Sequence, residues 1–370
     1  MKILEAFGEP ISYGGQEAFV LNVLEKMDSS GLETDLLTPY YCDNQNAHFI
    51  AGANGGQVYE LSLSFRPGSI RNGAERKILS FLRSHSYDVI HIHSGSSSML
   101  EIYARLAHRA GIPRIIVHSH STGYNDWKHR ASKFATSFGL RKYPTDYCAC
   151  SVEAGEWRFP MDICRNSLRV IADGIDAYRF RFDPQIRSKM RKEFGLSDDD
   201  IVIGNAGRLV SQKNQLYLIY LLDSIRGIKG GERYKLVIAG DGEDREKLKE
   251  HVSSLGLDDS VLFTGLFENI CDFYQAVDVL AIPSVYEGFC IAAAEGQAAG
   301  LDVIVSDRVP KAAGITESIT FIPLENREAW ISAIMSHHER HAGNADMIAE
   351  SAYDIRKVAA GVKEMYLEGK

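Results

Sequence analysis

The sequence has no uncharged apolar run that approaches the roughly 18 residues needed for a membrane-spanning helix. It also has no internal repeat, low-complexity tract or heptad run, so neither a repeat array nor a coiled coil is expected. The opening segment MKILEAF is interrupted by Glu5 and lacks a small-residue cleavage site, which favours a first β-strand over a signal peptide. These absences predict a globular protein that stays in the cytoplasm.

Cysteine spacing excludes the common zinc and disulfide frameworks. The six cysteines show no C-x-x-C spacing and no accompanying histidine pattern, so reduced and mostly buried thiols are expected. Positive charge is in deficit as well, since the net charge is −8. This deficit argues against general nucleic-acid binding. The deficit is uneven: residues 1–170 hold 18 Lys and Arg against 17 Asp and Glu, and residues 171–370 hold 23 against 32. The first half therefore carries the more basic surface.

Short apolar segments alternate with helical patterns along the whole chain, which is typical of α/β folds with doubly wound parallel sheets. A chain of 370 residues exceeds what one core usually serves, so we expect two Rossmann-like domains that face a cleft. The series of strands restarts near Ile201 after a polar stretch. We place an N-terminal domain at 1–172 and a C-terminal domain at 173–345. One last helix, at about 345–366 and assigned to the segment 346–370, crosses back to the first domain or caps the second, and 43–56 is expected to be a long surface loop.

Gly14 and Gly15 follow the first predicted strand and precede an amphipathic helix. Two glycines at that point allow the backbone to approach a phosphate, and an unliganded flexible turn is the alternative. The segment is not a dinucleotide fingerprint, because the G-x-G-x-x-G motif is missing. A nicotinamide-dependent oxidoreductase is therefore disfavoured.

Four histidines stand at the ends of two predicted strands. His118 and His120 lie in IIVHSHSTG and His91 and His93 in VIHIHSGSS, each pair on one side of its strand by the period of two. His120, nearer the strand end, is the better candidate to reach a ligand. A structural role or a zinc site built from these histidines remains the alternative.

Arg208 and Lys213 follow the first strand of the second half in IVIGNAGRLVSQKN. Two cations five residues apart, beside a strand end and a helix start, are what a diphosphate requires when its charge grows on leaving. An ordinary charged loop is the alternative. The next strand ends in Gly240, Asp241 and Gly242, which predict a second tight turn at the same edge.

The segment VLAIPSVYEGFCIAAAEGQAAGLDVIVSD carries the most functional information. Glu287 lies in the loop after an apolar strand and Glu295 lies in the first turns of the following helix. In an open α/β sheet, ligands bind beyond the carboxyl ends of the strands, where helix N-termini offer N–H groups to anions. The two carboxylates could accept hydrogen bonds from sugar and ribose hydroxyls, while N–H groups near Phe289 and Cys290 hold a phosphate. The arrangement suits a nucleotide sugar.

Together, these motifs resemble family four of the GT-B-fold retaining glycosyltransferases, in particular bacterial members that build capsular or other extracellular polysaccharides. The similarity covers essentially the whole chain and rests on YGGQE, VHSHS, CSVEAGEW, VIADGID, GNAGRLVSQKN, AGDGEDREKL, the segment with the two glutamates and the closing helix. The E-x7-E spacing and the R-x4-K pair are its most specific elements. The resemblance implies two domains, the first for the acceptor and the second for the nucleotide sugar.

The resemblance also implies transfer from a nucleoside-diphosphate sugar, most often a UDP-sugar, with retention and with no bound metal or other cofactor. Arg208 and Lys213 would hold the diphosphate, Glu295 the ribose, and Glu287 the donor sugar. His120 would orient that sugar, with His118 as the fallback. The catalytic candidates are thus His120, Glu287, Arg208 and Lys213, and the donor-binding set is Gly14, Gly15, Arg208, Lys213, Glu287, Gly288, Phe289, Cys290 and Glu295.

One departure from the family stands at Asp173, where members usually have Asn before Gly-Ile-Asp. It puts a hinge or an acceptor-side contact in doubt. Two other functions stay open, a non-catalytic nucleotide- or glycan-binding partner subunit and a nucleotide-sugar 2-epimerase of the same fold. No additional carboxylate pair at the strand ends supports the epimerase.

Residues 124–143 combine basic residues with Trp127, Phe134, Phe138 and Tyr143. Such a helix on the acceptor domain could rest on an anionic bilayer at the inner face of the cell membrane and take a lipid-linked saccharide. The alternative is an amphipathic helix packed on its own sheet with a solvated basic face.

Overall fold

The computed structural model describes residues 1–64, 74–123, 127–267, 269–336 and 338–368. The chain forms two compact units, one from Met1–Gly174 with Ile355–Lys370 and the other from Ile175–Asp354. The division falls two residues after the boundary expected at 172, and the chain returns to the first unit nine residues after 346.

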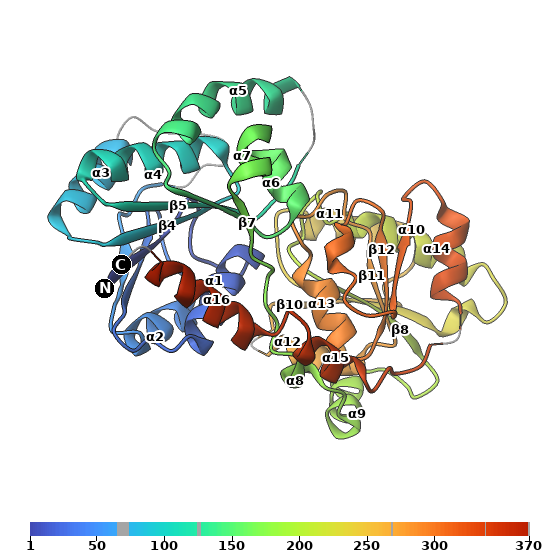
Figure 1. Cartoon of the computed structure of the whole chain (residues 1–370). Coiled ribbons are helices and arrows are strands. Elements are labelled where there is room, and N and C mark those ends of the chain that lie inside the picture. Colours follow the sequence, from blue (N-terminus) through green and yellow to red (C-terminus); the bar gives the residue numbers. More distant parts are fainter. Residues whose placement is uncertain (65–73, 124–126, 268, 337, 369–370) are drawn as a thin grey trace. The chain divides into compact units, whose positions relative to one another are not determined.

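The first unit is built on a seven-stranded parallel sheet in the order β3-β2-β1-β4-β5-β6-β7. Its strands are β1 Lys2–Phe7, β2 Glu33–Thr38, β3 Val58–Glu60, β4 Val89–Ser94, β5 Arg114–Ser119, β6 Asp146–Ala149 and β7 Leu168–Val170. Its helices are α1 Gly15–Lys26, α2 Gln45–Ala53, α3 Ala74–Ser84, α4 Ser97–Ala110, α5 Trp127–Lys142, α6 Val152–Arg158, α7 Met161–Asn166 and α16 Ile355–Leu367. Helix α16 packs against α1, and both chain termini belong to this unit (Figure 1).

The second unit has a six-stranded parallel sheet in the order β10-β9-β8-β11-β12-β13. Its strands are β8 Ile201–Ala206, β9 Tyr234–Ala239, β10 Val261–Gly265, β11 Val279–Ile282, β12 Asp302–Ser306 and β13 Ile319–Ile322. Its helices are α8 Ala177–Phe180, α9 Pro184–Glu193, α10 Gln215–Arg226, η1 Gly231–Arg233, α11 Arg245–Ser254, α12 Ile270–Ala276, α13 Ile291–Ala298, η2 Lys311–Ala313, α14 Arg327–Ile334 and α15 Asn344–Glu350.

Apolar runs in the central strands explain both sheets. The β-branched and aliphatic side chains of β8, β9, β11 and β12 are almost fully buried, as expected of parallel strands covered on both faces. In both units the first strand pairs with two neighbours and the strand order reverses there. The predicted α/β class with two doubly wound parallel sheets is confirmed, and the strand ends after β8 and β11 lie at such a reversal.

Two local expectations were wrong. The segment 43–56 is not a loop, because Asn44 caps α2 by accepting a hydrogen bond from the Asn46 N–H at 3.1 Å. The closing helix is interrupted: α15 ends at Glu350 in the second unit, and α16 begins at Ile355 in the first. The Ser351 backbone is extended, so one continuous helix is impossible there.

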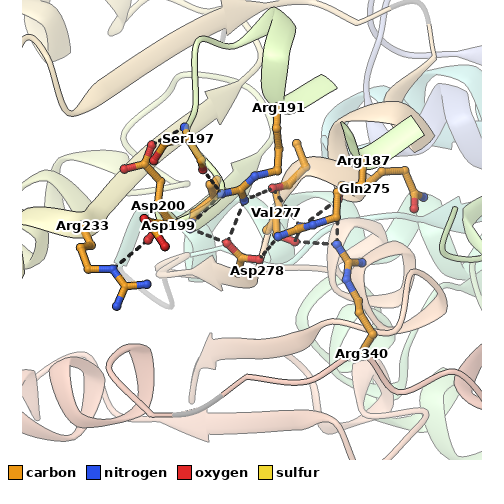
Figure 2. A network of polar contacts seen from close by, with 12 residues as sticks. Arg187, Arg191, Ser197, Asp199, Asp200, Arg233, Gln275, Val277, Asp278 and Arg340 are labelled. Atoms are coloured by element: carbon orange, nitrogen blue, oxygen red, sulfur yellow. Dashed lines mark hydrogen bonds and ion pairs between the residues drawn. The ribbon is translucent and has the colours of Figure 1, made fainter. Parts of the chain in front are cut away.

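An arginine network closes one end of the second unit's sheet (Figure 2). Arg187 and Arg191 pair with the two carboxylate oxygens of Asp278, at 2.6 and 3.2 Å, just before β11. Arg340 donates to the carbonyls of Tyr274, Gln275 and Val277. Carbonyls at the end of a helix such as α12 have no N–H partner within the helix. Burial lowers the pKa of Arg340 to about 9. The network fixes α9 and α12 against the start of the strand that leads to Glu287.

Of the helices described here, none combines the length and apolar character that crossing a bilayer requires.

Candidate functional site

The strongest polar contact at the strand ends of the second unit joins the loops after β8 and β11. Lys213 Nζ lies 2.6 Å from Glu287 Oε1, and the Ser284 hydroxyl donates to the same oxygen at 2.6 Å. Glu287 is 6% exposed. Burial acts to lower the pKa of Lys213, but the Glu287 carboxylate outweighs it and the pKa is raised. Lys213 is therefore charged, and the contacts with Lys213 and Ser284 hold the Glu287 carboxyl group in place.

Side chains on both sides of Lys213 tie its loop to the loop after β11. Gln212 accepts at its carbonyl from the Val285 N–H at 2.8 Å and donates from Nε2 to the Tyr286 carbonyl at 2.9 Å. Asn214 Nδ2 donates to the Pro283 carbonyl at 3.2 Å. These bonds bring the predicted residues Lys213 and Glu287 together and leave little freedom for either loop.

Two helices begin in this region, and both start from strained residues. Asn214 caps α10 with φ of 56°, and Cys290 caps α13 with φ of 87°. A non-glycine residue in the left-handed region costs on the order of 1 to 3 kcal/mol and persists where the surroundings impose it. The turns aim the first N–H groups of both helices into the strand-end region, which favours an anion there.

Glu295 lies one turn into α13 and accepts a hydrogen bond from the buried Tyr274 hydroxyl at 2.6 Å. Burial raises the pKa of Glu295, although the Tyr274 bond opposes the change. Burial also raises the pKa of the Cys290 thiol to about 12, with Glu287, Lys213 and Glu295 all acting on it. The four groups thus share one region, with Gly288 and the buried Phe289 between them in the chain.

Arg208 is exposed, and its carbonyl accepts from Gln215 Nε2 at 3.0 Å, so its guanidinium is on the solvent side of the same loop. Its charge acts on Lys213. The turn at Gly240 and Gly242 lies against this loop: a Cβ on Gly240 would stand 2.0 Å from the Gly207 carbonyl oxygen. The G-x-G segment is therefore required because two backbones meet there.

The four histidines lie in the first unit: His91, His93 and His118 are on one face of β4 and β5, and His120 directly follows β5. His93 and His118 are register partners, and His91, His93 and His118 are fully buried. Burial lowers the pKa of all four, that of His93 to about 3, so the imidazoles are neutral. Ring nitrogens of His91, His93 and His118 all lie within 4.8 Å of one another, so the zinc alternative has a geometric basis.

His120 stands at the outer end of this group, and its side chain is 5% exposed. Its Nδ1 lies 4.0 Å from Asp173 Oδ1. Burial raises the pKa of Asp173 to about 8, so this carboxyl is largely protonated at neutral pH. Asp173, which departs from the family pattern, is therefore the neighbour of His120, the histidine expected to contact the sugar.

Gly14 and Gly15 begin α1, also in the first unit, with Gly14 as the N-cap residue. A Cβ on Gly14 would meet Glu17 Oε2 at 2.5 Å, so a side chain there would displace the Glu17 carboxyl group. The proposed approach of a phosphate to these N–H groups stays a prediction.

Sequence reasoning missed the partners of the predicted residues. Tyr274, Ser284 and Gln212 orient the second unit's acidic and basic groups, and Glu5 and Tyr366 join the histidines. Gln212 and Ser284 had a local signal, since Gln212 directly precedes Lys213 and Ser284 lies three residues before Glu287. Tyr274, Glu5 and Tyr366 meet their partners only through the folding of each unit.

The basic, aromatic surface of the first unit lies on α5. Trp127, Phe134 and Phe138 are 68%, 82% and 71% exposed, and their spacing of seven and four residues places them on one helix face. Arg130, Arg141 and Lys142 are exposed on the same helix. Residues 124–126 and the Lys128 side chain, which belong to the predicted surface, lie outside the described residues.

Family profiles match both units. The profile "Glycosyl transferases group 1" matches residues 186–339, and "Glycosyl transferase 4-like domain" matches residues 14–174. MJ1607 of Methanocaldococcus jannaschii, named as a glycosyltransferase, is 30% identical over 311 residues, which are 80% of this chain and 77% of that protein. EpsF of Bacillus subtilis, likewise named as a glycosyltransferase, is 29% identical over 309 residues with the same coverage.

A third relative is the Escherichia coli UDP-Gal:alpha-D-GlcNAc-diphosphoundecaprenol alpha-1,3-galactosyltransferase, 29% identical over 61% of this chain and 59% of that enzyme. Among solved structures, Anabaena Alr3699/HepE in complex with UDP and glucose superposes with a TM-score of 0.79 at 19% identity over the full length of both chains. That likeness shows the fold, which is GT-B. The profile matches and the 30% identity across most of a relative show that the chain belongs to family four of the glycosyltransferases, the group 1 glycosyl transferases.

Proposed function

We propose that this glycosyltransferase moves a sugar from a UDP-sugar to a saccharide or lipid-linked saccharide in surface polysaccharide or glycoconjugate synthesis, with retention of configuration and without a catalytic metal. The observation that carries the proposal is the joined loop pair of the second unit, where Lys213, Glu287 and Glu295 lie around the start of α13. UDP is favoured because HepE binds UDP and UDP-glucose and the E. coli relative is named for UDP-Gal.

The chemistry of the groups supports these roles. Lys213 and Arg208, with the first N–H groups of α13, supply the positive charge that a departing diphosphate needs, which is work that Mg²⁺ does in other transferases. Glu295, held by Tyr274, is suited to accept hydrogen bonds from two ribose hydroxyls. Glu287, held by Lys213 and Ser284, is suited to accept from the donor sugar. His120 would orient the same sugar from the first unit.

The first experiment is a thermal-shift panel with UDP, GDP, ADP and CMP in the presence of EDTA, with NAD as a control. A ligand that binds only the folded state raises the melting temperature with its concentration. We expect a shift with UDP alone. A shift with UDP but no turnover of any UDP-sugar would favour the non-catalytic partner subunit, and the absence of every shift would refute the donor assignment.

Variants separate the roles. Glu295→Gln should weaken UDP binding, whereas Glu287→Ala and His120→Ala should lower kcat more than they lower UDP affinity. Isothermal titration with UDP and a transfer assay read the two effects. If all three variants weaken UDP binding equally and do nothing else, the role assignments are wrong.

For the acceptor side we propose peripheral contact of α5 with an anionic membrane. Its exposed aromatic stripe can enter the interface while its basic residues meet anionic headgroups. Flotation with phosphatidylglycerol-containing liposomes tests this. Wild type should float, a Trp127/Phe134/Phe138 triple Ala variant should stay at the bottom, and a variant at exposed Phe49 of α2 should behave as wild type. Equal behaviour of all three proteins would refute the contact.

A further inference from the structure

Glu5 belongs to the same buried group as the four histidines and accepts two short hydrogen bonds. The Tyr366 hydroxyl donates to Oε1 at 2.5 Å, and His93 Nε2 stands 2.7 Å from Oε2. Such distances are typical of bonds to an ionised acceptor, and an ionised carboxylate has no proton to give. Glu5 is 2% exposed, and burial outweighs His91 and the Tyr366 bond, so its pKa is raised; the ionised form is inferred from the two short bonds.

With an acceptor at Glu5, the first chain of bonds has one possible direction. Tyr366 has a single proton and gives it to Glu5, so its oxygen accepts from His91 Nδ1 at 2.7 Å. A neutral imidazole carries one proton, so His91 Nε2 accepts from His118 Nδ1 at 3.1 Å. The chain therefore ends at a His118 Nε2 without a proton.

The second chain runs through His93. Its Nε2 proton goes to Glu5, so its Nδ1 accepts from His120 Nε2 at 2.9 Å. The His120 Nδ1 is then unprotonated. Independently of this reasoning, His118 Nε2 and His120 Nδ1 are the two ring nitrogens of the group that are buried without a hydrogen-bond partner among the described residues. Both chains thus end where the structure leaves an acceptor unused.

We propose that Glu5 fixes the tautomers of all four histidines, so that His120 presents an unprotonated Nδ1 as hydrogen-bond acceptor for a hydroxyl of the bound sugar. Glu5 and His93 are positioning residues, because they act on the sugar through His120. The contact between His120 and the sugar rests on the proposed function, whereas the assignment of the tautomers does not.

The surroundings of the group agree with neutral, fixed imidazoles. Phe19 of α1 covers His118 and His120 with ring centroids 5.1 Å away, so that side supplies no charge. Tyr366 comes from α16, and Asp146 of β6 acts on His91 from a distance. Asp173, largely protonated at neutral pH, faces His120 Nδ1 and can turn toward it when no sugar is bound.

Nitrogen NMR of protein labelled with ¹⁵N-histidine reads the tautomers directly, because protonated and unprotonated ring nitrogens resonate far apart. The chain has 12 histidines, and single His118→Gln and His120→Gln variants assign the two that matter. At pH 7 with EDTA we expect unprotonated His120 Nδ1 and His118 Nε2. A proton on His120 Nδ1 in wild type would overturn the proposal, as would a spectrum that changes when EDTA removes a metal from these nitrogens.

Glu5→Gln is the informative variant. An amide accepts with its oxygen but must donate with its nitrogen, so it reverses one of the two chains, and either His118 Nε2 or His120 Nδ1 should gain a proton. Tyr366→Phe is the matched control, because it cuts the first chain and should leave the His120 tautomer as in wild type. A folded Glu5→Gln protein in which both end nitrogens stay unprotonated would overturn the proposal, and the wild-type spectrum decides alone if the variant does not fold.

Activity gives a second readout. If Glu5→Gln reverses the His120 chain, kcat should fall on the order of tenfold to a hundredfold, by analogy with the loss of hydrogen-bond partners that orient metal-ligating histidines. UDP affinity should change little, because the side chains assigned to the ribose and the diphosphate, those of Glu295, Arg208 and Lys213, lie in the second unit. Predicted tautomers without any sugar transfer by wild type would support the tautomer assignment and refute the proposed function.

Discussion

Replacing Asp173 by Asn should stabilise the protein relative to wild type increasingly as the pH rises from about 4 to about 8. Burial raises the pKa of Asp173 from 3.8 to about 8. In that window the unfolded chain has lost the proton while the folded chain keeps it. The folded state binds more protons, so wild-type stability falls as the pH rises. The amide of Asn binds no proton and removes this dependence.

The magnitude follows from the pKa difference. Each pKa unit corresponds to about 1.4 kcal/mol, so about four units set an upper bound near 5 to 6 kcal/mol between pH 4 and 8. Local relaxation around the charged form reduces the expected change to about 2 to 5 kcal/mol. For a domain of this size, 1 kcal/mol corresponds to roughly 2 to 4 °C in Tm, so the Tm difference should grow by about 4 to 20 °C.

Scanning calorimetry of wild type, Asp173→Asn and Asp43→Asn at several pH values measures this difference. Asp43 is an exposed carboxylate of the same unit, so its variant controls for the loss of one negative charge. A Tm difference between wild type and Asp173→Asn that is the same at pH 5 and pH 8 would refute the reasoning, because it would mean that the carboxyl titrates alike in both states.

Three further changes test packing in the second unit. Gly240→Ala should prevent correct folding of the strand-end loops, because its Cβ would stand 2.0 Å from the Gly207 carbonyl oxygen; circular dichroism and UDP binding report the loss. Asp278→Ala removes the carboxylate shared by two arginines and should cost about 3 to 5 kcal/mol in urea denaturation. Gly296→Ala gains up to about 1 kcal/mol in helix propensity, but its Cβ would stand 2.5 Å from Leu280, so a lower Tm is expected.

The grouping of Lys213, Glu287 and Glu295 in the second unit was predictable because its signals are local. The residues Lys213, Glu287 and Glu295 each follow a strand whose apolar run is plain in the sequence, and parallel strands bring their carboxyl ends to one edge. The side chains that hold them were not predictable, since Tyr274 reaches Glu295 from a helix 21 residues earlier in the chain. No spacing rule links residues so far apart.

Composition misled where it outweighed a specific signal. The run of Asn, Gly and Gln at 43–56 favours a loop on average, yet one capping residue, Asn44, is enough to start α2 when Ala47, Ile50 and Ala51 can be buried. Conversely, the Gly240–Gly242 turn was recognised but its cause was not. The close approach of a second loop is a tertiary contact, which the sequence of the turn does not contain.

The partners of the four histidines were likewise not predictable from local sequence, and the burial of this group bears on function. The shared face of His91, His93 and His118 follows from the period of two along β4 and β5, but in the sequence Glu5 is only a break in an apolar first strand. Burying a carboxylate among neutral imidazoles costs free energy that apolar side chains at the same positions would not cost. The hydrogen bonds within the group offset part of that cost. They do nothing for His118 Nε2 and His120 Nδ1, so under the proposed function a ligand hydroxyl at His120 would supply a hydrogen bond that the described residues do not.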